Sequence, residues 1–110
     1  MDRVILFQRE DESIKITIEA YFDGKGNLMV EGYDIGKTVE EYWGDSDYEY
    51  SITIGPEELK KLYTLLQLAD DSRDELFSYL QLHYHTNSCY SELGEFLDRN
   101  NIKHEGFSWI

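Results

Sequence analysis

Carboxylates and aromatic side chains are densely interleaved over residues 40–50, a segment with five carboxylates and four aromatic residues. Tyrosine and tryptophan offer large, rigid contact areas and are enriched at binding hot spots. Neighbouring carboxylates can pair with lysine and arginine of a basic partner. We therefore predict a partner-binding surface made of Glu40, Glu41, Tyr42, Trp43, Asp45, Asp47, Tyr48 and Glu49. The alternative is an acidic loop whose aromatic residues fold back on the core.

Two groups of residues are candidates for metal sites, one for calcium and one for zinc. The spacing of Asp45, Asp47 and Glu49 is similar to that of a calcium loop, but the glycine that such a loop requires does not follow them. A zinc site needs about four soft ligands at matched spacing. His83, His85 and Cys89 supply three at unequal spacing. We therefore predict no metal site and no cofactor.

Catalytic motifs are missing from the sequence. No serine lies in a glycine-flanked nucleophile elbow, and no glycine-rich loop precedes a Lys-Ser or Lys-Thr pair. Any two of the 23 acidic residues could be imagined as an acid–base pair, so such a pair carries little information. The sequence predicts a protein that is not an enzyme.

The charge indicates the kind of partner. The chain has 23 acidic and 10 basic residues, a formal net charge of −13, and residues 31–50 alone contain seven acids and one base. Such a field repels nucleic acids and anionic membranes and attracts basic partners. We expect a basic protein partner, with no nucleic acid and no membrane. The alternative is that the acidity only keeps the protein soluble.

Length and composition favour one folded domain over residues 1–110, because domains cluster near 100–150 residues. The apolar share of 41% argues against disorder. A single cysteine, Cys89, excludes an internal disulfide and fits a reducing compartment. No signal peptide and no run of about 20 apolar residues is seen, so we expect a cytoplasmic protein.

The first half of the chain is typical of strands. Apolar residues at 14, 16, 18, 20 and 22 alternate with polar ones, which puts the apolar set on a buried face. Residues 23–27 supply glycines for a hairpin. We expect strands over 4–7, ending in a charged turn at 9–12, and over 14–22, 28–35 and 48–54, with 102–110 as a last strand or an extended segment.

The second half changes to a helical period. Pro56 starts a first helix, and a capping box pairing Ser72 with Glu75 starts a second. A third helix ends at Asn100-Asn101, residues that tolerate a left-handed cap. The expected buried positions are Leu59, Leu62, Tyr63, Leu66, Ala69, Leu76, Phe77, Leu80, Tyr84, Leu93, Phe96 and Leu97. Strands followed by helices predict an α+β fold, an antiparallel sheet of four to five strands with about three helices on one face.

Residues 33–50 and 102–109 are similar to motifs in a family of small bacterial proteins, a resemblance that spans about residues 28–110. Members of that family resemble the cytoplasmic immunity proteins of contact-dependent and polymorphic toxin systems. The resemblance implies a non-catalytic protein that binds and neutralises one cognate toxin, a basic and nuclease-like domain.

Two other functions are left open. A nucleic-acid mimic would inhibit DNA-binding proteins, although its carboxylates should be spread along a long face. A small metal-binding protein would use His83, His85 and Cys89.

Overall fold

The computed structural model describes residues 3–36 and 47–109. It contains β1 (Arg3–Glu10), β2 (Lys15–Phe22), β3 (Leu28–Ile35), β4 (Asp47–Ile54), α2 (Pro56–Leu65), α3 (Arg73–His83), α4 (Cys89–Arg99) and β5 (Glu105–Trp109). The fold is α+β, as the sequence predicts. None of the described helices is both long and apolar enough to cross a bilayer.

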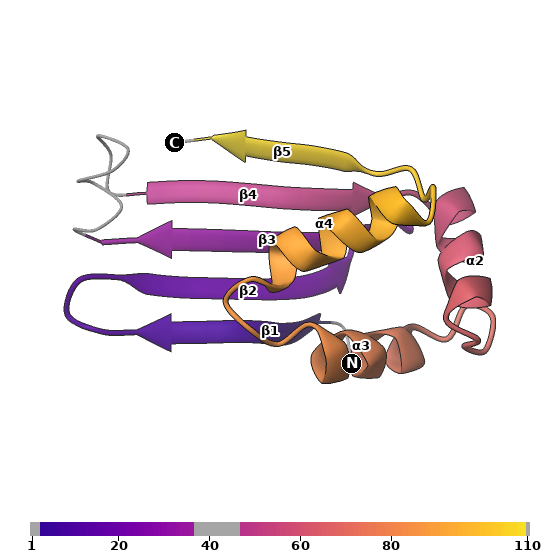
Figure 1. Ribbon diagram of the computed structural model, residues 1–110, viewed down its shortest axis with the longest axis horizontal. Coiled ribbons are helices and arrows are strands. Elements are labelled where there is room, and N and C mark those ends of the chain that lie inside the picture. Colours follow the sequence, from indigo (N-terminus) through magenta and orange to yellow (C-terminus); the bar gives the residue numbers. More distant parts are fainter. Residues whose placement is uncertain (1–2, 37–46, 110) are drawn as a thin grey trace.

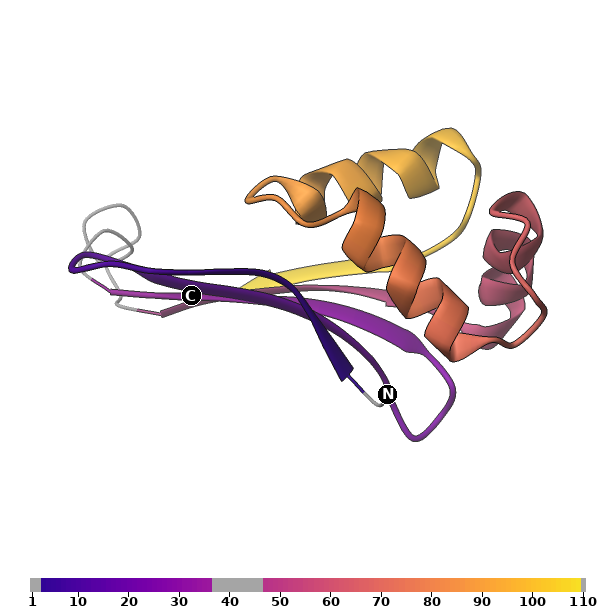
Figure 2. The same cartoon turned by 90° about the horizontal axis from the view of Figure 1, so that it is seen from below.

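The five strands form one antiparallel sheet in the order β1-β2-β3-β4-β5. The three helices lie between β4 and β5 in the chain (Figure 1). All three lie on the same side of the sheet, with α3 and α4 over its face and α2 at the end of the strands, and the opposite face carries no described helix (Figure 1, Figure 2). At one end, the strands extend beyond the helix layer (Figure 2).

The core lies between the sheet and the helices. The sheet contributes Val4, Leu6, Ile16, Ile18, Ala20, Leu28, Val30, Ile52 and Ile54, and the helices and the segment after them contribute Leu59, Leu62, Tyr63, Leu76, Phe77, Leu80, Cys89, Leu93, Leu97 and Ile102. The period-two alternation therefore predicted the buried face of β2 correctly. Ala69 is exposed, contrary to the prediction, because α2 ends at Leu65 and Gln67 turns the chain with a positive φ of 58°.

The start of α3 differs from a full capping box in one respect. Ser72 Oγ accepts a hydrogen bond from the Glu75 amide at 3.4 Å, as predicted. The Glu75 carboxylate, however, accepts from the amide of Ala69 at 3.1 Å instead of that of Ser72. The reciprocal contact therefore ties the α2–α3 loop to α3.

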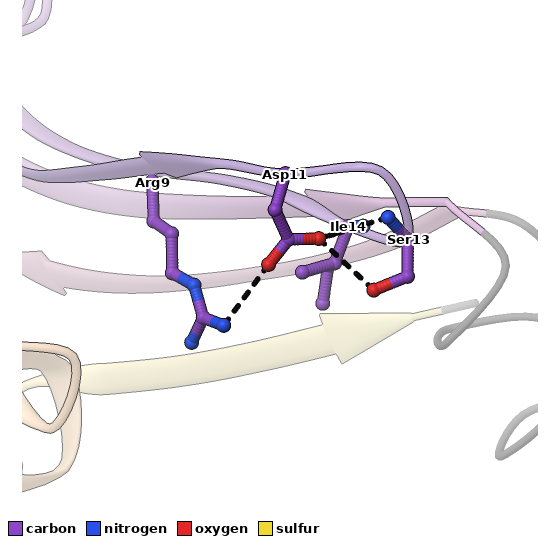
Figure 3. A network of polar contacts seen from close by, with 4 residues as sticks. All are labelled: Arg9, Asp11, Ser13 and Ile14. Carbon is purple, nitrogen blue, oxygen red and sulfur yellow. Dashed lines mark hydrogen bonds and ion pairs between the residues drawn. The ribbon is translucent and has the colours of Figure 1, made fainter.

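The β1–β2 turn is held by one carboxylate. β1 runs to Glu10, so the charged turn begins two residues later than predicted. Asp11 Oδ1 accepts from the Ser13 amide at 2.8 Å, the Ser13 hydroxyl at 2.9 Å and the Ile14 amide at 3.0 Å. Arg9 donates to Oδ2 at 2.9 Å (Figure 3). These bonds, those from Ser13 first, lower the pKa of Asp11 to about 2.

The hairpin predicted at residues 23–27 is confirmed. Asp23 donates its amide to the Asn27 carbonyl at 3.0 Å, and its carboxylate accepts from the amides of Lys25 and Asn27. Gly26 supplies the positive φ of 83° that the turn requires.

Gly32 is required by a close contact on the helix-covered face. The register places it opposite Tyr50, whose ring lies over the glycine. A Cβ at position 32 would lie 1.9 Å from a ring atom of Tyr50. The Tyr50 hydroxyl donates a hydrogen bond to Asp34 Oδ1 at 2.8 Å. The centre of the Tyr50 ring lies 4.7 Å from the centre of the Tyr90 ring on α4.

Candidate functional site

The candidate site is the helix-free face of the sheet, which we call the open face. Strand register and alternation place on it Arg3, Ile5, Gln8, Glu10, Lys15, Thr17, Glu19, Tyr21, Met29, Glu31, Tyr33, Ile35, Asp47, Glu49, Ser51, Thr53, Glu105 and Phe107. Large apolar side chains reach solvent here, with Phe107 58% exposed and Ile5 48% exposed. An open face of this composition is therefore a candidate surface for a partner.

A hollow of about 530 Å³ lies across β2, β3, β4 and β5 on this face. Nine of its lining residues belong to the open face, namely Lys15, Thr17, Glu19, Glu31, Tyr33, Ile35, Glu49, Ser51 and Phe107. Gly32 and Tyr50 also line the hollow. Gly32 has no side chain and the Tyr50 side chain lies on the helix-covered face, so the backbone of these two residues forms part of the floor. The volume lies within the roughly 300–1,000 Å³ of ligand sites.

Two carboxylates in the hollow face each other across β2 and β3. Glu19 is directly opposite Glu31, an arrangement of like charges that destabilises a sheet. Arg3 offsets part of this cost with a 2.8 Å ion pair to Glu19. Glu31 accepts a 2.6 Å hydrogen bond from the Tyr21 hydroxyl, which raises the pKa of Tyr21 to about 12. The two carboxylates are therefore fixed in place by neighbouring side chains.

A third carboxylate, Glu49, lies on β4 directly opposite Tyr33. Within the described residues, neither Glu49 nor Glu31 forms an ion pair with a lysine or arginine. Lys15 borders the hollow but is directly opposite Glu10 on β1. The hollow therefore carries an excess of negative charge beside aromatic rings.

Three of the eight predicted partner-binding residues are described by the structure. Asp47 and Glu49 lie on the open face, and Glu49 lines the hollow. Tyr48 lies on the helix-covered face, with its ring 5.3 Å from that of Tyr50. Glu40, Glu41, Tyr42, Trp43 and Asp45 lie outside the described residues.

Neither metal-site interpretation gains support. In residues 3–36 and 47–109, no three His, Cys, Asp or Glu side chains are grouped to hold an ion. Cys89 is buried in the core, and burial raises its pKa to about 11. His104 contacts the Ile102 carbonyl at 3.0 Å, far in sequence from the His83–Cys89 group. One of the calcium candidates, Asp45, lies outside the described residues.

Sequence reasoning missed Glu19, Glu31, Tyr33 and Phe107 as site residues. A signal for three of them is present, because the pattern Glu-x-Tyr occurs at 19–21 and again at 31–33. Period-two alternation puts both members of each pattern on one face. The pairing of β2 with β3 then brings the two patterns together.

No family model, curated protein or solved structure matches this chain. The toxin-immunity resemblance therefore rests on the sequence motifs alone.

Proposed function

We propose that this protein is a non-catalytic immunity protein that binds a basic toxin domain through its open face and acts in the cytoplasm. The observation that carries the proposal is the hollow in that face, where Glu19, Glu31 and Glu49 lie beside Tyr33 and Phe107. Carboxylates beside exposed aromatic rings suit a surface rich in arginine and lysine.

The charge and size of the protein support this mode of binding. A net charge of −13 steers a basic partner inward and speeds association. The molecule measures 43 × 26 Å in its two longest directions, so one face accommodates the roughly 800 Å² per partner of a standard interface. A nuclease-like toxin covered in this way would lose access to its anionic substrate, since its basic surface holds phosphates.

The first experiment identifies the partner. The tagged protein is recovered from its native host at moderate salt, and bound proteins are identified by mass spectrometry. We expect one stoichiometric basic protein that is toxic when expressed alone and harmless with this chain. Recovery of several unrelated DNA-binding proteins would support a nucleic-acid mimic and contradict the proposal, as would an empty column.

The second experiment locates the interface on the recovered partner. Charge reversal by Glu31→Lys with Glu49→Lys should slow association by at least about tenfold, and the loss should shrink at high salt. The matched control is Glu95→Lys with Asp70→Lys, which makes the same change in net charge at exposed positions of the helix layer. Equal slowing by both pairs would indicate net charge alone and contradict an open-face interface.

A further inference from the structure

The Glu-x-Tyr pattern of β2 already holds an arginine. Arg3 Nη1 lies 2.8 Å from Glu19 Oε1, and the guanidinium carbon lies 4.6 Å from the centre of the Tyr21 ring. Arg3 is directly opposite Tyr21 on the neighbouring strand β1. The fold therefore contains one complete arginine site made of a carboxylate and a tyrosine ring on one strand.

The same pattern recurs on β3 as Glu31 and Tyr33. Because β2 and β3 are antiparallel and Glu19 is opposite Glu31, a local two-fold axis normal to the sheet relates the two patterns. This axis exchanges β1 with β4, so the position equivalent to Arg3 is the residue opposite Tyr33. That residue is Glu49.

The pattern on β3 therefore has the carboxylate of Glu49 at the position where the pattern on β2 has the guanidinium of Arg3. Glu31 and Glu49 lie on adjacent strands as diagonal neighbours, since Glu31 is opposite Ser51. Diagonal neighbours are about 7–8 Å apart, within reach of one long side chain placed between them. The hollow of about 530 Å³ leaves room for such a side chain above the strands.

The carboxylate of Glu31 is already held in one orientation by a neighbouring side chain. Its Oε1 is held by the Tyr21 hydroxyl at 2.6 Å, which fixes the carboxylate before any ligand arrives. A planar guanidinium suits this setting better than an ammonium, because it donates to carboxylates through a fork and stacks on aromatic rings.

We propose that the hollow receives an arginine side chain from the basic partner, bound between the carboxylates of Glu31 and Glu49. This inference rests on the proposed function for the source of the arginine. The binding chemistry itself is a property of this chain and is measured without the partner.

The test uses N-acetyl-arginine N-methylamide as the probe, titrated into uniformly ¹⁵N-labelled protein and followed by NMR. The expected dissociation constant is roughly 1–10 mM, with shifts confined to β2, β3 and β4 around the hollow. The citrulline derivative has the same shape without the charge and should bind about tenfold more weakly. Shifts that are equal for both probes, or that spread over the helix layer, would overturn the proposal.

The decisive variant is Glu49→Arg, which places the chain's own guanidinium where the two-fold axis maps Arg3. We expect probe binding at the hollow to fall at least about tenfold while the protein stays folded. Glu95→Arg makes the same charge change on α4 and should leave the binding of the probe within about twofold. Unchanged binding by Glu49→Arg, or equal losses in both variants, would contradict the site.

A third variant separates charge from shape. Glu31→Gln keeps an oxygen for the Tyr21 hydroxyl and should still weaken the arginine probe about tenfold. Probe binding without any toxic partner in the host would support the arginine site and contradict the immunity function. If a toxic partner is confirmed but the probe does not bind, the immunity function is supported and the arginine site is contradicted.

Discussion

The two faces of the sheet are built from the same strands but are stabilised differently. The helix-covered face buries an apolar layer in which Ala20, Val30 and Ile52 lie side by side across β2, β3 and β4. On the open face, the residues one step along these strands are Glu19, Glu31 and Ser51. One face thus buries the apolar core, and the other places like charges directly opposite each other.

Loss of a core aromatic residue should give the largest decrease in the free energy of unfolding. Phe77 on α3 is fully buried, and its ring centre lies 5.4 Å from that of Phe22. We expect Phe77→Ala to lower the free energy of unfolding by about 3–5 kcal/mol, measured by urea denaturation. On the open face, Phe107→Ala should cost less than about 1 kcal/mol, since its side chain is 58% exposed. Similar losses would mean that the open face is also part of the folding core.

A methyl group on the helix-covered face should have the next largest effect. Gly32→Ala places a Cβ against the Tyr50 ring, and we expect a loss of about 1–3 kcal/mol from overpacking. The matched control is Gly106→Ala on β5, where nothing lies within 4 Å of the added atom. The control should change the unfolding free energy by less than about 0.5 kcal/mol. Equal changes in unfolding free energy for the two variants would show that the Tyr50 ring moves aside without an energetic penalty.

Removal of a charge from the open face should favour stability over binding. Glu31→Gln relieves the repulsion from Glu19, so the free energy of unfolding should stay level or rise by up to about 1 kcal/mol. Binding of the proposed basic partner should weaken in the same variant, which surface plasmon resonance measures. A stability loss above about 1 kcal/mol would indicate that the carboxylate has a structural role.

The smallest effect concerns the β1–β2 turn and depends on pH. Asp11 has a folded pKa of about 2, below its ordinary value of 3.8. A lowered folded pKa means that the carboxylate stabilises the protein above pH of about 4, and this contribution is lost as the pH falls toward 2. Asp11→Asn should therefore destabilise the protein at pH 6 but much less at pH 2.5, by urea denaturation. Glu12→Gln is the control, and a pH-independent difference for Asp11→Asn would contradict this mechanism.

Local patterns predicted the elements better than they predicted the site. Alternation in β2 fixed which face is buried, and Pro56 fixed the start of α2. The burial of Ala69 was wrongly predicted because α2 ends at a left-handed turn at Gln67, a position where no glycine signals such a turn. Local signals of this kind depend on neighbouring residues only.

The site depends on strand register, which alternation alone does not fix. The prediction centred the partner-binding surface on residues 40–50, of which Asp47 and Glu49 lie on the open face. Glu19 and Glu31 belong to other strands and become neighbours only through the pairing of β2 with β3. The repeat of Glu-x-Tyr is visible in the sequence, but only the pairing of β2 with β3 shows that its two copies are neighbours.

The position of the helices between β4 and β5 has a consequence for the order of folding. Strands β1 to β4 pair with their sequence neighbours, whereas the pairing of Thr53 with Glu105 spans almost half of the chain. Contacts between distant residues form slowly because loop closure precedes them. During synthesis, four strands emerge and can pair before β5 leaves the ribosome. We therefore expect the sheet to be completed last at the edge that borders the hollow, and the site to form only when the whole chain has folded.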